Sequence, residues 1–307
     1  MHQSSGRWHL GLALSLLTVF LWGILPITLA ITLQELDPYT VTWFRFLVSF
    51  ALLGIYLGWQ GKLPKLKNFA GWKLLAIATV FLATNYILFL IGLALTTPNN
   101  AEVIIQLAGV LMGLGGLVIF RERYTLAQWI GVGVLTLGFA LFFHEQLTNL
   151  ITAQTKYLFG SGLIVLGAAA WAIYALAQKQ LLQSLSSSNI MLMIYGGCAI
   201  LFTPFAAPLK ILTLHPFHFG MLVLCALNTL IAYGAFAESL EHWDASRVSA
   251  ILALTPIVTL VVSWLVSSLT PNLLTPEHLT SLAIFGAFFV VCGSAAIAIS
   301  KSPEKQT

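Results

Sequence analysis

The sequence predicts an all-α integral membrane protein whose ten transmembrane helices form two five-helix repeats of inverted topology. Three observations support this fold: an apolar composition, ten long apolar segments, and residues that recur at nearly fixed distances in the two halves. Of the 307 residues, 59% are hydrophobic and 8% are charged, and the mean hydropathy is +0.92. A soluble domain carries about a quarter charged residues. Most of this chain must therefore face lipid or itself.

Each predicted span supplies about 20 apolar residues, which is the helix length needed to cross a hydrocarbon layer of about 30 Å. The first span is too long for a signal peptide and has no convincing small-residue cleavage site, so we expect it to be retained. The three cysteines lie inside apolar stretches, which favours core packing over disulfides or metal binding. The predicted spans are Trp8–Leu33, Pro38–Trp59, Trp72–Thr96, Asn99–Phe120, Thr125–Phe143, Tyr157–Gln178, Asn189–Pro208, Phe217–Leu240, Ala245–Val266 and Glu277–Ser300.

The basic residues predict the orientation. With the N-terminus in the cytoplasm, eleven of the 14 lysines and arginines fall on the cytoplasmic side. Lys156 and Lys210 fall outside, and Arg45 lies within a span. Because loops rich in Lys and Arg stay in the cytoplasm, both termini are predicted to be cytoplasmic.

An internal repeat relates the two halves. Glu122, just before span five, and Gly131 and Gly138 within it recur at a displacement of 155 residues as Glu277, Gly286 and Gly293 of span ten. Five spans are an odd number, so the second copy must enter the membrane from the opposite side. We place the first repeat at residues 1–143, an extracytoplasmic linker at 144–156, the second repeat at 157–300 and a cytoplasmic tail at 301–307.

Short motifs in five spans resemble the drug/metabolite transporter superfamily, specifically its ten-span branch of two EamA-type repeats. The motifs are Trp22-Gly23, Arg45-Phe46, Arg121-Glu122-Arg123, Trp171-Ala172-x-Tyr174 and Thr255-Pro256. The resemblance covers nearly the whole chain. It implies a secondary transporter, often an exporter, with a central pathway lined mainly by spans one, three, four, six, eight and nine.

Arg45 is the sharpest candidate because it lies about two turns inside span two, where a charge costs about 2.5–3.5 kcal/mol on insertion scales. It is expected to bind an anionic group of a solute, to hold Glu102 in a gate, or to extend outward as a structural anchor. Glu35 and Asp37 are alternative partners. Glu102 itself is a candidate for proton coupling, or for a helix N-terminal acid stabilised by the helix dipole.

Three further residues are candidates for gating or coupling. Glu238 lies at the inner end of span eight and is expected to pair with Arg247, or to belong to a solvated inner mouth. Arg247 occupies the position in the second repeat that Glu102 has in the first. Pro256 breaks span nine, whereas its counterpart in span four is Leu111, so a symmetric hinge is not expected.

Aromatic and amide side chains complete the predicted pathway, although each aromatic has core packing as the alternative. Asn85 and Asn228 occupy comparable places in the two repeats and are predicted to form a central polar pair, because a buried amide needs partners in lipid. The amide and aromatic residues of the pathway are Trp22, Asn85, Tyr86, Gln106, Trp171, Tyr174, Asn228 and Tyr233.

Motifs for ATP hydrolysis, zinc proteases and serine hydrolases are missing, which argues against an enzyme and against a cofactor or metal. The sequence and the resemblance together predict a secondary transporter in the cytoplasmic membrane that moves a small organic metabolite, such as an amino acid, by alternating access, and the resemblance implies that the direction is export. Its expected partners are the solute, membrane lipid and protons, with no nucleic acid.

Two alternatives stay open. A sugar-phosphate or nucleotide-sugar exchanger would need more basic groups in the cavity than Arg45. A lipid flippase or lipid-modifying protein would need the inner cluster of Glu238, Glu241, His242 and Asp244.

Overall fold

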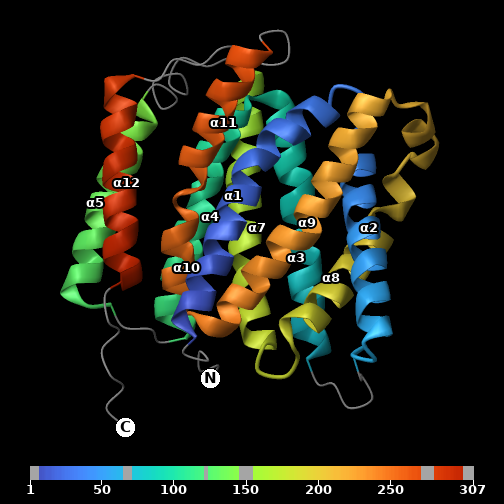
Figure 1. Ribbon diagram of the computed structural model, residues 1–307, viewed down its shortest axis with the longest axis horizontal. Helices are drawn as coiled ribbons and strands as arrows, with labels where there is room; N and C mark the ends of the chain where they lie inside the picture. Colours follow the sequence, from blue (N-terminus) through green and yellow to red (C-terminus); the bar gives the residue numbers. More distant parts are fainter. Residues whose placement is uncertain (1–6, 65–70, 121–123, 145–154, 271–279, 300–307) are drawn as a thin grey trace.

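The computed structural model describes residues 7–64, 71–120, 124–144, 155–270 and 280–299, and these residues are helical with short connections and no strand (Figure 1). The helices are α1 (Trp8–Thr32), α2 (Pro38–Trp59), α3 (Trp72–Leu95), α4 (Pro98–Ile119), α5 (Leu126–Phe142), α7 (Thr155–Leu181), α8 (Ser187–Phe202), α9 (Pro216–His242), α10 (Ala245–Leu252), α11 (Thr255–Leu269) and α12 (Ser281–Ile299), with 3-10 turns η1 (Thr203–Phe205) and η2 (Pro208–Thr213).

Eight segments of the described chain are long and apolar enough to cross a membrane, counting α10 and α11 as one segment. Two shorter apolar helices, α5 and α12, coincide with the predicted spans five and ten. At 1.5 Å per residue, the 17 residues of α5 extend about 26 Å, near the lower limit for a span. The predicted all-helical membrane fold is confirmed, and the count of ten spans rests on α5 and α12.

Polar residues at the helix starts set several boundaries. Asp37, Thr97 and Ser186 each accept a hydrogen bond from a backbone N–H in the first turn of α2, α4 and α8. Thr125 and Gln128 form a reciprocal capping box at the start of α5. These side chains satisfy N–H groups that a helix end leaves unpaired.

The helices pack as a pseudo-twofold arrangement. The first helix of each repeat packs against the third helix of the other, since α1 contacts α9 and α7 contacts α3. Likewise α4 contacts α7 and the α10–α11 segment contacts α1, while α2 pairs with α8 and α5 with α12. This pattern is unchanged when the two halves are exchanged, as inverted repeats require.

The two ends of the helix bundle are named here by their connections. The α7–α8 end holds residues 182–186, and α1 begins and α12 ends at this same end (Figure 1). The α1–α2 end lies opposite and holds residues 33–37. Because α1 runs away from the α7–α8 end and α7 runs toward it, the corresponding helices of the two repeats are antiparallel.

The repeated glycines lie at the contact between α5 and α12. A Cβ added at Gly131 would lie 3.0 Å from the carbonyl oxygen of Gly293, and one added at Gly286 would lie 2.8 Å from that of Gly138. The glycines therefore let the two backbones approach closely. Glu122 and Glu277, which share the repeat, lie outside the described residues.

Span nine is broken while its counterpart is continuous. Ala253 and Leu254 separate α10 from α11, and Pro256 is the second residue of α11. Span four runs unbroken as α4 through Leu111. The predicted asymmetry of the two halves is therefore present.

The connection between α8 and α9 is tied to the start of α2. Lys210 forms an ion pair with Asp37 at 3.6 Å, and the Ala207 amide donates to the Thr40 hydroxyl at 2.9 Å. Partial burial favours the protonated carboxyl of Asp37, but hydrogen bonds from Thr40 and the charge of Lys210 outweigh it and lower its pKa. Asp37 is thus engaged at the end of the bundle and is not a partner of Arg45.

Candidate functional site

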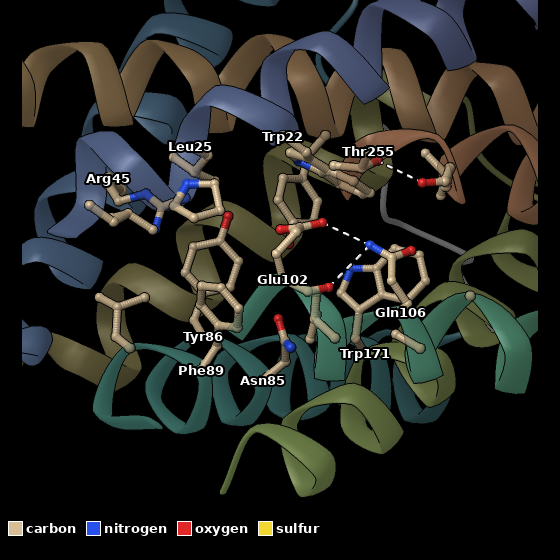
Figure 2. Close-up of a pocket in the computed structure, with 18 residues that line it drawn as sticks. Trp22, Leu25, Arg45, Asn85, Tyr86, Phe89, Glu102, Gln106, Trp171 and Thr255 are labelled. Carbon is tan, nitrogen blue, oxygen red and sulfur yellow. Dashed lines mark hydrogen bonds between the residues drawn. The ribbon is translucent and has the colours of Figure 1, made fainter. Parts of the chain in front are cut away.

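A pocket lies between the two repeats (Figure 2). Its empty volume is about 730 Å³, which includes the solvent space at its open side. Side chains from α1, α2, α3, α4, α7, α9, α10 and α11 line it. They are Trp22, Leu25, Pro26, Leu29, Arg45, Asn85, Tyr86, Phe89, Leu90, Glu102, Ile105, Gln106, Ala108, Gly109, Trp171, Tyr233, Leu252 and Thr255.

The pocket occupies the half of the bundle nearer the α1–α2 end. Arg45 lies seven residues after Pro38, about 10 Å along α2, and Glu102 lies one turn into α4. Trp22 and Trp171 lie nearer mid-helix, and they mark the deep side of the pocket.

An aromatic cluster closes this deep side. The Trp22 ring lies 5.6 Å from Trp171 and 5.0 Å from Tyr233, measured between centroids, and 5.4 Å from Phe236. Tyr174 lies behind this layer, with its ring 6.1 Å from Tyr233. Edge and tilted contacts of this kind pack aromatic side chains tightly, so the cluster separates the pocket from the α7–α8 end.

Arg45 is held inside the protein and does not extend to the outer surface. Its side chain is 1% exposed, and Nε donates to Thr229 Oγ1 on α9 at 2.8 Å. The guanidinium carbon lies 4.6 Å from the centroid of the Tyr86 ring, a cation–π contact. Thr229 in turn donates to the Cys225 carbonyl of its own helix. A neutral hydroxyl and an aromatic ring thus hold this buried charge.

Glu102 is the second ionisable group of the pocket. It is 4% exposed and accepts a hydrogen bond from Gln106 Nε2 at 2.7 Å, one turn further along α4 (Figure 2). Within the described chain, no ion pair joins Glu102 to Arg45. Arg45 and Glu102 thus share one pocket, and each is hydrogen-bonded to a neutral neighbour.

Two further polar groups of the pocket have unused hydrogen-bonding capacity. The indole N–H of Trp22 and the hydroxyl of Tyr86 are shielded from solvent and have no hydrogen-bond partner among the described residues. A buried donor without a partner costs about 1–3 kcal/mol. Such groups in a pocket indicate that a ligand or water completes them.

Asn85 and Asn228 do not form the predicted pair. Asn85 lines the pocket and donates to the Gly167 carbonyl of α7 at 3.0 Å. Asn228 lies outside the pocket and donates to the Leu21 carbonyl of α1. Each amide joins the third helix of its repeat to the first helix of the other, so the positions are related by symmetry without touching.

The remaining predicted residues lie away from the pocket. Glu238, near the α7–α8 end, accepts a hydrogen bond from Ser187 and lies 3.6 Å from His242 Nε2. Arg247 is in the first turn of α10 at the same end. Pro256 follows the pocket residue Thr255 but does not line the pocket itself.

Sequence reasoning missed the apolar wall and two hydroxyl groups. Leu25, Phe89 and Ile105 line the pocket, yet nothing distinguishes them in sequence from leucines and isoleucines that face lipid. Thr229 follows Asn228 directly, and Thr255 belongs to the Thr-Pro motif of span nine. Thr229 is therefore next to a residue that the sequence singles out, and Thr255 is part of a motif that it singles out.

No group of three or more His, Cys, Asp or Glu side chains in the described ranges is arranged to hold a metal ion. The cysteines of the chain are all free thiols, with Cys198 and Cys225 buried and Cys292 exposed. The side chains that line the pocket offer ionic, hydrogen-bonding and aromatic contacts.

Comparison with known proteins assigns the chain to a family. A model described as the EamA-like transporter family matches it twice, at residues 9–144 and at residues 158–299. The chain is 37% identical to a protein of Escherichia coli named uncharacterized inner membrane transporter YhbE, with 96% of this chain and 92% of that protein covered. It is 35% identical to a protein of Haemophilus influenzae named uncharacterized transporter, with 94% and 95% covered.

More distant similarities extend over the same length. A protein of Escherichia coli named probable amino-acid metabolite efflux pump is 22% identical, with 91% of this chain and 92% of that protein covered. One solved structure superimposes with a TM-score of 0.69, covering 93% of this chain and 95% of the other at 16% identity. At that identity the superposition shows the fold alone.

Proposed function

This chain belongs to the EamA-like transporter family, and from that premise we propose that it exports a small organic metabolite through the pocket between its repeats. The observation that carries the proposal is a pocket with buried polar groups that the described protein does not complete. Trp22 and Tyr86 lack hydrogen-bond partners, and Arg45 and Glu102 lack a mutual ion pair. A polar solute would satisfy these groups in place of water.

The proposed transport cycle alternates the exposure of this pocket. The pocket lies toward the α1–α2 end, and the aromatic cluster of Trp22, Trp171 and Tyr233 closes it from the α7–α8 end. Lys62 and Lys73 lie at the α7–α8 end, and the positive-inside rule places that end in the cytoplasm. In this proposed orientation the conformation is outward-facing, and both termini are cytoplasmic in an inner membrane.

The inverted repeats supply the means of alternation. We assign them to residues 1–143 and 157–300, with 144–156 as an extracytoplasmic linker and 301–307 as a cytoplasmic tail. Exchanging the conformations of two such repeats exposes the central site to the other side. The break around Ala253 and Leu254, with Pro256 beside it, is the proposed hinge of span nine.

The solute class follows from the lining. Apolar and aromatic side chains form most of the wall, and the charged groups are few. An amphipathic metabolite of amino-acid size fits this lining, and the name of the distant Escherichia coli efflux relative agrees with it. Protons are the proposed coupling ion and Glu102 their site, because a carboxyl in the pocket can bind either a proton or a cationic group of the solute.

Two other functions have weaker support. A sugar-phosphate or nucleotide-sugar exchanger needs several cations, and Arg45 is the one lysine or arginine among the described lining residues. A lipid-modifying activity would use Glu238 and its neighbours, but Ser187 and His242 already engage that carboxylate. Transport without a metal or cofactor is the activity that we propose.

Reconstitution of the purified chain tests the proposal. Proteoliposomes would be loaded with the soluble metabolite pool of bacterial cells, and efflux would be read by mass spectrometry with and without a pH gradient. We expect selective loss of one class of metabolite, abolished by Arg45→Gln and retained by Arg7→Gln, because Arg7 is exposed at the start of α1. Efflux equal to that of protein-free liposomes for every metabolite would reject the transporter proposal.

A further inference from the structure

We propose that the pocket selects a solute carrying both a carboxylate and an ammonium group, which Arg45 and Glu102 bind at the same time. This inference rests on the proposed function and adds the charge requirement of the same site. It starts from the pocket having one basic and one acidic side chain among its described lining residues.

The fold keeps these two charges apart. Arg45 on α2 is bound through Nε to Thr229, and Glu102 on α4 is bound to Gln106. In the view of Figure 2, Arg45 and Glu102 lie on opposite sides of Tyr86. Opposite charges buried in a common pocket gain strongly from pairing, so their separation leaves each of them available to a ligand group.

The side of the pocket around Arg45 suits a carboxylate. Thr229 accepts from Nε, and the other guanidinium nitrogens make no hydrogen bond to another residue of the described chain. The Tyr86 hydroxyl lacks a partner as well, and its ring lies 4.6 Å from the Arg45 guanidinium carbon. Guanidinium and hydroxyl donors together match the two oxygens of a carboxylate.

The side around Glu102 suits an ammonium group. Glu102 accepts one side-chain hydrogen bond, from Gln106, and an ionised carboxylate has about four acceptor positions. Gln106 Nε2 also donates to the backbone carbonyl of Glu102 at 3.3 Å, which holds the side-chain amide of Gln106 against the same turn of α4. The carboxylate therefore keeps acceptor positions for the three N–H donors of an ammonium group.

Charge balance explains why both groups are required. A solute with a carboxylate alone would satisfy Arg45 but could not displace the proton from Glu102, because it brings no ammonium group to take the place of that proton. A solute with an amine alone would displace the proton and leave the Arg45 guanidinium without a counter-charge. Burying an uncompensated charge is strongly unfavourable, so only the dipolar solute satisfies both ends, while Leu25, Phe89 and Ile105 accommodate its apolar portion.

The same arrangement links the solute to a proton. On the outer side, a proton from water binds the Glu102 carboxylate and breaks its contact with the ammonium group, which leaves with the solute. On the inner side, the ammonium group of the next solute molecule binds the carboxylate and the proton passes to water. One proton thus enters for each dipolar molecule that leaves.

Matched compounds test the inference on the reconstituted full-length chain. Counterflow would be measured for a panel of amino acids and, for each one transported, for its amine and acid analogues, for example phenylalanine, phenethylamine and phenylpropionate. We expect at least tenfold higher flux for the amino acid than for either analogue. Equal flux for an analogue would overturn the inference.

Charge-removing variants sharpen the test. Glu102→Gln is expected to raise the ratio of acid-analogue to amino-acid flux at least tenfold, and Arg45→Gln to raise the ratio for the amine analogue, because each variant removes the charge that the analogue fails to satisfy. Glu35→Gln and Arg7→Gln, both at exposed positions, are the matched controls. Unchanged ratios in folded variants would overturn the inference, and the analogue series decides it if the variants do not fold.

The outcomes separate the two proposals. Efflux of singly charged or uncharged metabolites from the mixed pool, without flux of any amino acid, would overturn the charge requirement and leave the transporter proposal standing. Absence of flux for every compound of the pool and the panel would overturn both.

Discussion

The hydrogen bond between Arg45 and Thr229 gives a quantitative prediction for Thr229→Val. Valine has nearly the shape of threonine, so the variant removes the hydroxyl without leaving a cavity. The lost bond is 2.8 Å long, completely buried, and joins α2 of the first repeat to α9 of the second. Hydrogen bonds to charged groups contribute about 1.5–3 kcal/mol. We expect Thr229→Val to lower the free energy of unfolding by this amount.

The size of this effect is measurable. Since about 1.4 kcal/mol changes an equilibrium tenfold, the ratio of folded to unfolded protein should fall by about 10- to 150-fold. Unfolding of the purified protein in mixed detergent micelles, followed by the fluorescence of its nine tryptophans, gives the free energy directly. Thr229→Ser keeps the hydroxyl and should retain the part of the stability that depends on Arg45.

Thr79→Val is the matched control. The Thr79 hydroxyl is also buried, but it donates to the Leu75 carbonyl of its own helix. That carbonyl already accepts a helical hydrogen bond, so the loss should stay within about 0.5 kcal/mol. Equal stability of Thr229→Val and Thr79→Val would refute the reasoning that Thr229 compensates the buried guanidinium.

Three other variants test separate features. Gly286→Ala places a Cβ against the backbone of Phe142 in α5 and should lower the free energy of unfolding by about 1–3 kcal/mol. Gly133→Ala is the control, because a Cβ added there meets open space, and it should not destabilise the protein. Equal free energies of unfolding for the two variants would contradict the close α5–α12 contact. Asp37→Ala should cost about 0.5–2 kcal/mol at neutral pH. Because its folded pKa is lowered, the contribution of Asp37 is present above its unfolded pKa and is lost as pH falls through the folded value, and a pH-independent cost would count against it. Ser184→Cys, exposed at the α7–α8 end, should react with an impermeant thiol reagent from the cytoplasmic side, and labelling from outside would invert the topology.

The fold could be predicted from the sequence because the apolar segments and the internal repeat depend on it directly. Apolar segments of span length predict the helices, and the residues displaced by 155 predict that α5 and α12 are equivalent helices of two repeats. The resemblance to EamA-type transporters, drawn from motifs such as Trp22-Gly23, is confirmed by the family match. These features depend on local composition and spacing, which a single chain records.

Hydrogen-bond partners on different helices could not be predicted from the sequence. The burial cost of Arg45 marks it as important, but its partner Thr229 lies 184 residues away, and a threonine in an apolar helix ordinarily bonds its own backbone. Asn85 and Asn228 show the converse error, because equivalent positions in two repeats need not touch. Each amide reaches a carbonyl of the opposite repeat instead.

Accessibility of the pocket tests the central claim most directly. Ala108 lines the pocket and is 4% exposed, and a cysteine placed there is close to it in size. In a background with Cys198, Cys225 and Cys292 replaced, the account predicts that Ala108→Cys reacts with a small impermeant thiol reagent from outside the cell, and more slowly in the presence of an amino-acid mixture. The fully buried Ala226→Cys, which lies outside the pocket, should not react. Reaction of Ala108→Cys from the cytoplasmic side alone, or at a rate unaffected by every solute, would contradict an outward-facing binding site between the repeats.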